Sequence, residues 1–162
     1  MRVCGVAAGG QHSLVVSATG RLYSFGAGGD GRLGHGEHSN ELAPRLVEKL
    51  EGVRVLEVAA GEHHSLALCD GKVYSFGDGR HGKLGHGDAA PQMVPRVIAG
   101  LQGVRVSSVA AAGTTSLAVT TDGEVYGWGH GVQNGRLYPV LGLELTEDQL
   151  VPLKYPGLLL RA

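Results

Sequence analysis

Cysteine and long apolar runs are both scarce in this sequence of 162 residues. The two cysteines, Cys4 and Cys69, form no Cys-x-x-Cys pair, which argues against a disulfide framework, a cysteine-ligated metal or a redox centre. No apolar stretch approaches the length of about 20 residues that a membrane-spanning helix needs. Together these absences predict reduced thiols and a location inside the cell, in the cytoplasm or the nucleus.

Charged residues are also few, at 18%, and the formal net charge is −1. The chain therefore lacks the basic excess that accompanies phosphate contacts, and direct binding to DNA or RNA is not expected. Helical periodicity is almost absent, and only residues 47–51 and 146–150 are expected to form a turn of helix. The fold class that these patterns indicate is all-β.

Glycine, by contrast, is abundant, with 28 residues that recur at fixed points of the chain. The glycine-rich segment 73–87 has a near copy at 22–36 and a degraded copy further downstream. Tyr23 lies 51 residues before Tyr74, and Tyr74 lies 52 residues before Tyr126. Self-similarity at a fixed period predicts three repeats, which span about 2–52, 53–103 and 104–157.

Each repeat carries four short strand patterns. A β-branched segment ends in alanine and glycine, an alternating strand follows, and a tight turn leads into a third strand. The Asp-Gly turns at 70–71 and 122–123 predict hairpins, because glycine supplies the positive φ that such turns need. Four strands in about 50 residues are typical of a propeller blade. The fourth strands are predicted to begin at Pro44, Pro95 and Pro152.

Aromatic residues make up only 5% of the chain, and most of them stand in pairs two residues apart. Side chains at that spacing share one face of a strand, so the pairs are expected to pack between neighbouring blades. The pairs are Tyr23/Phe25, Tyr74/Phe76 and Tyr126/Trp128.

The third repeat departs from the first two after Gly129. A longer segment, 138–143, replaces the Leu-Gly-His-Gly ending of the earlier glycine-rich loops. Irregular loops of repeat proteins often carry function, whereas a terminal repeat also drifts or acts as a cap. Both interpretations stay open at this point.

These motifs resemble the repeats of the regulator of chromosome condensation family. The resemblance rests on Ala-Gly-x-x-His-Ser-Leu, Asp-Gly-x-Val-Tyr-Ser-Phe-Gly, Gly-x-Leu-Gly-x-Gly and Pro-x-x-Val, in this order over nearly the whole chain. It implies blades of a seven-bladed β-propeller. Three four-stranded antiparallel blades do not easily close a ring, which takes about four to eight. We therefore expect an open arc that is part of a longer propeller, is completed by other chains, or is held by a larger assembly.

Three patterns that suggest chemistry are interpreted as structural. Gly-x-Gly-x-x-Gly at 26–31 and 77–82 matches the dinucleotide-binding pattern, but no helix is expected to follow it. Histidines recur at equivalent positions, as His12 and His64 do, which favours structural hydrogen bonds over metal binding. Adjacent His and Ser residues on a strand point to opposite faces and cannot share a proton. The sequence thus predicts no catalytic residue, no cofactor and no metal site.

The polar side chains of the glycine-rich loops remain as candidates for a site. Loops on one rim of a propeller commonly bind partners, so these residues are predicted to contact a protein; the alternative is a solvated rim. The candidates are Asp30, Arg32, Asp78, Arg80, His81, Lys83, His130, Gln133, Asn134 and Arg136.

The resemblance implies two classes of function. The first is a non-catalytic repeat module, a scaffold for protein–protein interaction whose partner is another protein or further propeller blades. The alternative is a guanine nucleotide exchange factor, or a fragment of one, for a Ran-like small GTPase. Two other activities of the family are not expected, because Trp128 is the only tryptophan available for ultraviolet-B sensing and this chain contains no ubiquitin-ligase domain.

Overall fold

The structure, a computed structural model, describes residues 1–130, 132–133, 136–137 and 147–156. The first four-stranded sheet consists of β1 (Val3–Ala8), β2 (His12–Ser17), β3 (Leu22–Gly26) and β4 (Glu41–Leu46). The second consists of β5 (Val55–Ala60), β6 (His64–Cys69), β7 (Lys72–Gly77) and β8 (Gln92–Val97). The third consists of β9 (Val106–Ala112), β10 (Thr115–Thr120), β11 (Val125–Gly129) and β14 (Gln149–Lys154).

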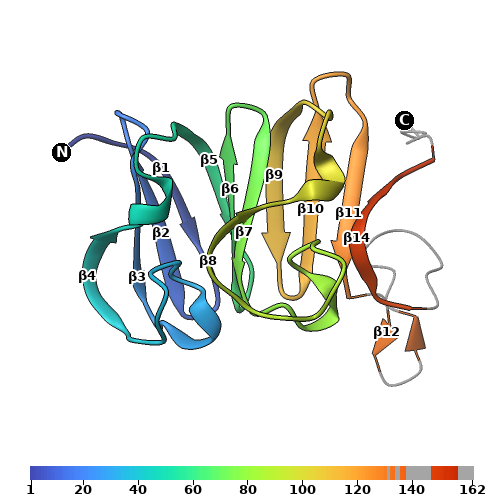
Figure 1. Cartoon of the computed structure of the whole chain (residues 1–162), viewed down its shortest axis with the longest axis horizontal. Coiled ribbons are helices and arrows are strands. Elements are labelled where there is room, and N and C mark those ends of the chain that lie inside the picture. The colour runs from blue at the N-terminus through green and yellow to red at the C-terminus, as the bar shows by residue number, and fades with distance from the viewer. Residues whose placement is uncertain (131, 134–135, 138–146, 157–162) are drawn as a thin grey trace.

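The three sheets are antiparallel and stand side by side along the long axis of the molecule (Figure 1). Strands β1, β5 and β9 are neighbours at one edge of the array, and β4, β8 and β14 form the opposite edges of their sheets. The prediction of an all-β fold with about three four-stranded antiparallel blades is confirmed. No helix in the described part of the chain has the length and apolar character to cross a membrane.

Short 3₁₀ turns and one small hairpin complete the described elements. A 3₁₀ turn follows β3 and another follows β7, and each of these opens a glycine-rich loop: η1 (Gly29–Gly31) and η3 (Arg80–Gly82). The other two lie between the sheets: η2 (Glu48–Leu50) and η4 (Ala99–Leu101). The hairpin is formed by β12 (Val132–Gln133) and β13 (Arg136–Leu137).

The predicted turns and the predicted helical segments have different outcomes. Asp70 and Gly71 both have positive φ, 48° and 78°, so the chain reverses between β6 and β7 as a two-residue hairpin requires. The helical turn expected at 47–51 is present as the 3₁₀ turn η2. The one expected at 146–150 is wrong for the described residues 147–150, because Gln149 and Leu150 begin strand β14 and Gln149 pairs with Gly129 of β11.

The predicted start of the fourth strands is also wrong. Each strand begins three residues before its proline, as β4 does at Glu41 ahead of Pro44. The register between β3 and β4 shifts at this point, between Ser24 and Gly26. Proline is tolerated there because the strand lies at the edge of its sheet and the irregular pairing requires no amide donor from it.

Apolar side chains fill the two spaces between the sheets. Leu14, Val16 and Leu22 of the first sheet pack with the fully buried Phe76 of the second. Trp128 of the third sheet has the same role against the second sheet and is also fully buried. The prediction that aromatic residues pack between neighbouring blades is therefore confirmed for the second and third repeats.

Two loop glycines lie against these aromatic rings. A Cβ atom on Gly34 would stand 3.0 Å from the ring of Phe76, and one on Gly85 would stand 3.0 Å from Trp128 Nε1. Both glycines have positive φ, 77° and 78°, which other residues rarely adopt. Each of these two glycine-rich loops therefore closes over the aromatic side chain of the following sheet, and a Cβ atom at either glycine would force that ring to shift by a few tenths of an ångström.

Histidine and serine connect each sheet to the next. The His12 Nε2 atom lies 2.8 Å from Ser65 Oγ, and Ser65 Oγ donates to the carbonyl oxygen of Arg32 at 2.8 Å. A hydroxyl has one proton, and a carbonyl oxygen can only accept. Since the serine proton is engaged, His12 Nε2 must be the donor in the first bond. His64, Ser116 and the Lys83 carbonyl repeat this arrangement with 2.8 Å for both bonds.

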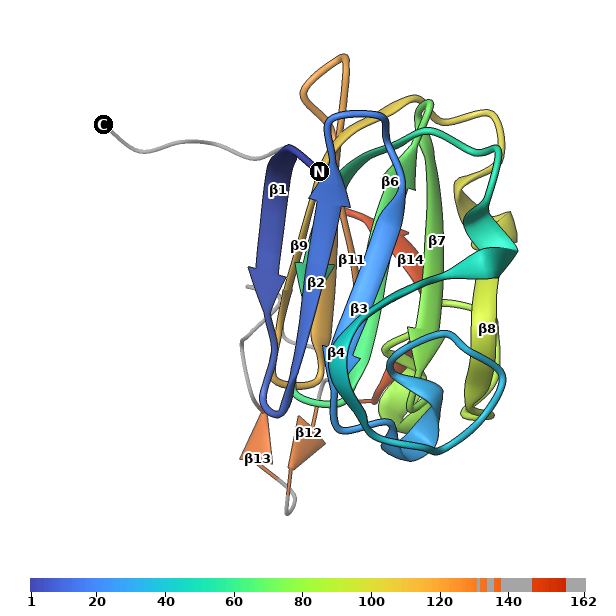
Figure 2. The same ribbon diagram turned by 90° about the vertical axis from the view of Figure 1, so that its left-hand side faces the viewer.

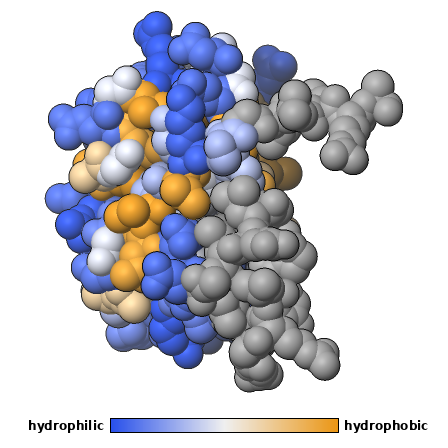
Figure 3. All heavy atoms as spheres, turned by 90° about the vertical axis from the view of Figure 1, so that its right-hand side faces the viewer, coloured by the Kyte–Doolittle hydropathy of each residue, from blue (hydrophilic) through white to orange (hydrophobic). Residues whose placement is uncertain are grey.

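The two ends of the array expose different faces. On the first sheet, Ser13 pairs with Phe25, and the equivalent pair on the second sheet, Ser65 with Phe76, faces the first sheet. Ser13 and Phe25 thus lie on the outer face of the first sheet, which is at the front in Figure 2. At the other end, Figure 3 shows hydrophobic side chains gathered over the third repeat, where Val119 and Leu153 are each 36% exposed.

We predict that Gly85→Ala destabilises the fold more than Gly103→Ala does. Both positions have similar φ, 78° and 81°, but a Cβ atom at Gly103 meets nothing within 4 Å. Gly103→Ala should cost about 1–2 kcal/mol for the left-handed backbone alone. Gly85→Ala should lower the free energy of unfolding by about 1–3 kcal/mol more than Gly103→Ala does, because its methyl group displaces Trp128. Equal losses in urea unfolding would show that the loop does not press against the ring.

We also predict that stability falls as the pH is lowered from about 6.5 to 5. Burial, with a contribution from Arg32, lowers the pKa of His12 to about 4, and burial, with Lys83, lowers that of His64 to about 3. Between these pH values the unfolded chain binds more protons than the folded chain does. Each of the two histidines should therefore lower the free energy of unfolding by up to about 1.4 kcal/mol for each pH unit of acidification.

The matched variants for this prediction are His64→Thr and His38→Asn. Threonine is the residue that the third repeat carries at this position, as Thr115, and His38 is exposed. His64→Thr should flatten the dependence of melting temperature on pH, and His38→Asn should leave it unchanged. The same slope in His64→Thr as in the unmodified protein would contradict this account of the buried histidines.

Candidate interaction surface

Those predicted contact residues that the structure describes follow β3, β7 and β11, on the lower side of the molecule in Figure 1. Asp30 and Arg32 belong to the first loop, and Asp78 to Lys83 belong to the second. His130 directly follows β11. Gln133 and Arg136 are described only by their backbone, in β12 and β13, and Asn134 lies outside the described residues.

A buried ion pair holds the second loop. Lys83 and Asp78 are 2% and 4% exposed, and the Lys83 ammonium group donates a hydrogen bond to the Asp78 carboxylate. Arg80 Nε donates to the same carboxylate at 3.0 Å. Burial alone would raise the pKa of Asp78, but these donors outweigh it and hold the pKa below its usual range. The carboxylate is thus charged and fully engaged inside the loop.

The first loop also buries a cation, but different residues form its hydrogen bonds. Ala27 stands where the second loop has Asp78, so the buried Arg32, at the position of Lys83, has no equivalent acid beneath it. Arg32 instead donates from Nε to the Gly29 carbonyl at 2.8 Å and from Nη2 to Asp30 at 3.3 Å. Both loops therefore bury a cation, and both keep it hydrogen-bonded within the loop.

A second set of histidine–serine pairs fixes the end of each loop. His35 Nε2 lies 2.9 Å from Ser24 Oγ, and Ser24 Oγ donates to the Leu33 carbonyl at 2.6 Å. His86 and Ser75 repeat this pattern, with 2.8 Å between Nε2 and Oγ and the Leu84 carbonyl as the acceptor. The expectation that repeated histidines are structural hydrogen-bonding residues is confirmed for these positions and for His12 and His64.

Three of the predicted residues are exposed on these loops and three are not. Arg80 is 66% exposed, and Asp30 and His81 are each 42% exposed. In contrast, Arg32, Asp78 and Lys83 are buried and make the contacts described above. Their charges hold the loops in shape, and the exposed set supplies the charged surface that another protein would meet.

The structure adds one residue that the sequence did not single out. Asp148, just before β14, has one carboxylate oxygen 2.9 Å from His81 Nδ1 and the other 3.3 Å from His130 Nδ1. His81 and Asp148 are 67 residues apart in the chain, so no local motif connects them. The predicted residues His81 and His130 are thus brought together, at a ring-centroid distance of 4.1 Å.

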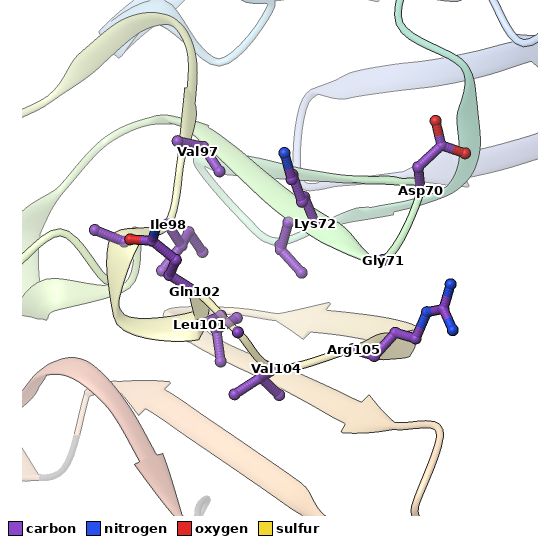
Figure 4. A pocket seen from close by; sticks show the side chains of 12 residues that line it. Asp70, Gly71, Lys72, Val97, Ile98, Leu101, Gln102, Val104 and Arg105 are labelled. Atoms are coloured by element: carbon purple, nitrogen blue, oxygen red, sulfur yellow. The ribbon is translucent and has the colours of Figure 1, made fainter.

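A separate cavity of about 560 Å³ lies at the end of the second and third repeats opposite to these loops. Figure 4 shows the apolar side chains of Ile98, Leu101 and Val104 on one side and the charged ends of Asp70 and Arg105 on the other. None of the predicted contact residues whose side chains the structure describes lines this cavity. It can accept an apolar group, and it contributes nothing to the loop surface.

The comparisons with known proteins agree with this architecture. Human E3 ubiquitin-protein ligase HERC2 is 45% identical over 134 residues, which is 81% of this chain and 3% of HERC2. Arabidopsis thaliana ultraviolet-B receptor UVR8 is 38% identical over 151 residues, which is 92% of this chain and 33% of the receptor. The chain therefore spans a third or less of these relatives.

Two solved structures share the fold over nearly the whole chain. The crystal structure of Prp20p from Saccharomyces cerevisiae, described with its binding to Gsp1p and histones, superposes with a TM-score of 0.80 at 28% identity. The match covers 96% of this chain and 39% of Prp20p. Human WBSCR16 matches with a TM-score of 0.79 at 29% identity, covering 95% of this chain and 38% of that protein.

The repeat itself provides the assignment. The sequence pattern described as the regulator of chromosome condensation (RCC1) repeat matches residues 19–68 and 70–119, and a second pattern of the same repeat matches 3–32 and 106–136. These matches cover most of the chain and coincide with the sheets and glycine-rich loops described above. The chain belongs to the RCC1 repeat family.

Proposed function

We propose that this chain is a non-catalytic RCC1-repeat module that binds a protein partner through its glycine-rich loops, within a larger protein or assembly. The main support for this proposal is that buried and exposed charged residues have different roles in those loops. Buried Arg32, Asp78 and Lys83 hold the backbone, and exposed Asp30 and Arg80 present charge at the same end of the molecule. A surface that is fixed before binding loses little conformational entropy when a partner docks.

The hydrogen bonds of the histidine–serine pairs support the non-catalytic part of the proposal. A serine nucleophile must give its proton to histidine, but Ser65 and Ser116 donate theirs to backbone carbonyls. Both serines are also fully buried, so no substrate can approach their hydroxyl groups. These pairs have the residue types of a hydrolase and the bonding pattern of a structural support.

The relatives support an interaction module because they differ in activity while they share the repeat. They include a ubiquitin ligase and an ultraviolet-B receptor, and Prp20p is described as binding Gsp1p and histones. The partner of this chain is accordingly proposed to be a protein, or further blades of the same propeller. The free cysteines Cys4 and Cys69 are consistent with a reducing location in the cytoplasm or nucleus.

The alternative is a guanine nucleotide exchange factor for a Ran-like small GTPase, or a fragment of one. The likeness to Prp20p, whose crystal structure is described with its binding to Gsp1p, is the observation that favours this alternative. We rank exchange activity second to the general interaction module, because the identity to Prp20p is 28% and the chain covers 39% of Prp20p.

We predict that Arg80→Ala weakens partner binding about five- to tenfold, whereas Lys72→Ala does not. Arg80 is exposed on the second loop, and Lys72 is exposed at the opposite end of strand β7. Each variant removes one cation, and Asp78 keeps Lys83 as its partner when Arg80 is lost. Quantitative mass spectrometry of proteins retained by the tagged chain and its two variants measures the difference. Partners that are retained equally by both variants would contradict docking at the loop surface.

The exchange alternative predicts that the chain accelerates release of labelled GDP from a Ran-like GTPase. The interaction module alone predicts the spontaneous rate. Fluorescence of bound methylanthraniloyl-GDP, followed with and without the chain, measures the difference. Acceleration that Arg80→Ala abolishes and Lys72→Ala preserves would assign exchange activity to the loop surface, and an unchanged rate would exclude it for this chain.

A further inference from the structure

Three side chains of metal-binding type meet where the second glycine-rich loop contacts the third sheet. His81 comes from η3, His130 directly follows β11 and Asp148 directly precedes β14 (Figure 1). One potential ligand atom from each residue lies within 4.8 Å of the other two. The two imidazole rings stand edge to face, with an angle of 85° between their planes. The fold thus gathers two imidazoles and a carboxylate from three separate segments.

We propose that His81, His130 and Asp148 form a binding site for a divalent transition metal ion of the Zn²⁺ class. Imidazole and carboxylate are ligands that Zn²⁺ accepts, at bond lengths of about 2.0–2.2 Å. In a tetrahedral site these lengths place neighbouring ligand atoms about 3.3 Å apart. The distances from the Asp148 oxygens to His81 Nδ1 and His130 Nδ1 are 2.9 Å and 3.3 Å.

The His130 ring supplies an independent reason for a bound ion. Its side chain is only 12% exposed, and within the described part of the chain neither ring nitrogen makes a hydrogen bond, although Nδ1 lies 3.3 Å from an Asp148 oxygen in ion-pair contact. An unsatisfied buried polar atom costs about 1–3 kcal/mol, so most such atoms have a partner in native proteins. A metal ion at Nδ1 would satisfy one of the two nitrogens.

The backbone of the second loop positions His81 for this site. His81 has a φ of 63°, a left-handed conformation that few residues other than glycine adopt. The equivalent position of the first loop, Asp30, has a φ of 58°, so the conformation belongs to the loop and not to the histidine. The repeat thus provides a fixed turn tip, and in the second loop this tip carries an imidazole toward the third sheet.

The junction between the first two sheets provides an internal comparison. Two equivalent backbone pairs define the correspondence between the junctions, Gly77 with Gln92 and Gly129 with Gln149. The positions of the three proposed ligands are occupied there by Asp30, Asp78 and Pro91. Proline offers no side-chain ligand, and the Asp78 carboxylate is engaged by cations. The ligand set is therefore particular to the second junction and is not a general feature of the repeat.

The charges around the site permit a cation. Lys83 and Arg80 of the second loop both bond to Asp78, which offsets their charge. Asp148 supplies a negative charge directly at the site, and its side chain is 31% exposed. His81 is 42% exposed, so an ion and its water can enter from solvent. Three protein ligands leave one position for a water molecule or for a side chain of a bound partner.

Zn²⁺ titration of the whole chain by isothermal calorimetry at pH 7.5 tests the site. We expect one saturable ion per chain, and Asp148→Asn should weaken its binding by at least about tenfold. His81→Asn should do the same without loss of fold, since asparagine tolerates the left-handed backbone and His81 is exposed. His38→Asn, an exposed histidine of the first loop, is the matched control and should bind as the unmodified chain does.

Two further measurements separate a metal site from a hydrogen-bonded cluster of the same residues. Co²⁺ should give the visible absorption of a four-coordinate site in the unmodified chain and lose it in Asp148→Asn. Zn²⁺ should raise the melting temperature of the unmodified chain and of His38→Asn only. The proposal is overturned if no saturable ion binds, or if Asp148→Asn and His81→Asn bind Zn²⁺ as tightly as the control.

Discussion

One hydrogen-bond arrangement recurs four times and connects the parts of this molecule. In each case a histidine Nε2–H donates to a serine hydroxyl, and the hydroxyl donates to a backbone carbonyl of a glycine-rich loop. Two of these four hydrogen-bond arrangements connect one sheet to the next, and the other two join a loop to its own sheet. Because each hydroxyl has a single proton, the direction of every bond is determined. Burial lowers the pKa of all four imidazoles, which favours their neutral form, and each loop is bonded both to its own sheet and to the next.

The loops owe their shape to this arrangement together with buried charge. A glycine-rich segment would be costly to order by itself, since glycine loses more backbone entropy than other residues do. Contacts with Phe76 and Trp128 from outside, and a buried Arg32 or Lys83 from inside, offset that cost. The exposed side chains are held in turn by bonds to these buried groups, as Arg80 is to Asp78 and Asp30 is to Arg32. This division explains how one repeat can present different surfaces in different proteins.

Much of the fold could be predicted from the sequence, because repetition reveals it independently of any single residue. The period, the Asp-Gly turn and the aromatic pairs all indicated packed four-stranded sheets. The outer strands were misplaced because proline suggests a strand start, whereas an edge position with irregular pairing accommodates Pro44 inside the strand.

The site was less predictable, for reasons of burial and distance along the chain. Arg32, Asp78 and Lys83 were expected on the surface, where charged residues usually lie. Their burial is explained by the hydrogen bonds between Lys83 and Asp78 and by those of Arg32 to the Gly29 carbonyl and Asp30. Asp148 has no local signal at all, because its relation to His81 and His130 exists only after the third sheet has paired. Tertiary pairing of this kind leaves no mark within a short stretch of sequence.

The bonds between sheets also have a polarity. Each sheet offers histidine on one face and accepts with serine on the other, so Ser13 stands at the accepting end of the array and Thr115 replaces the donor at the far end. Two copies that placed the same outer face against itself would bring identical groups together and could not form these bonds. Any association that reuses them must join the third-sheet end of one copy to the first-sheet end of the next, and such head-to-tail contacts generate a closed ring or a filament.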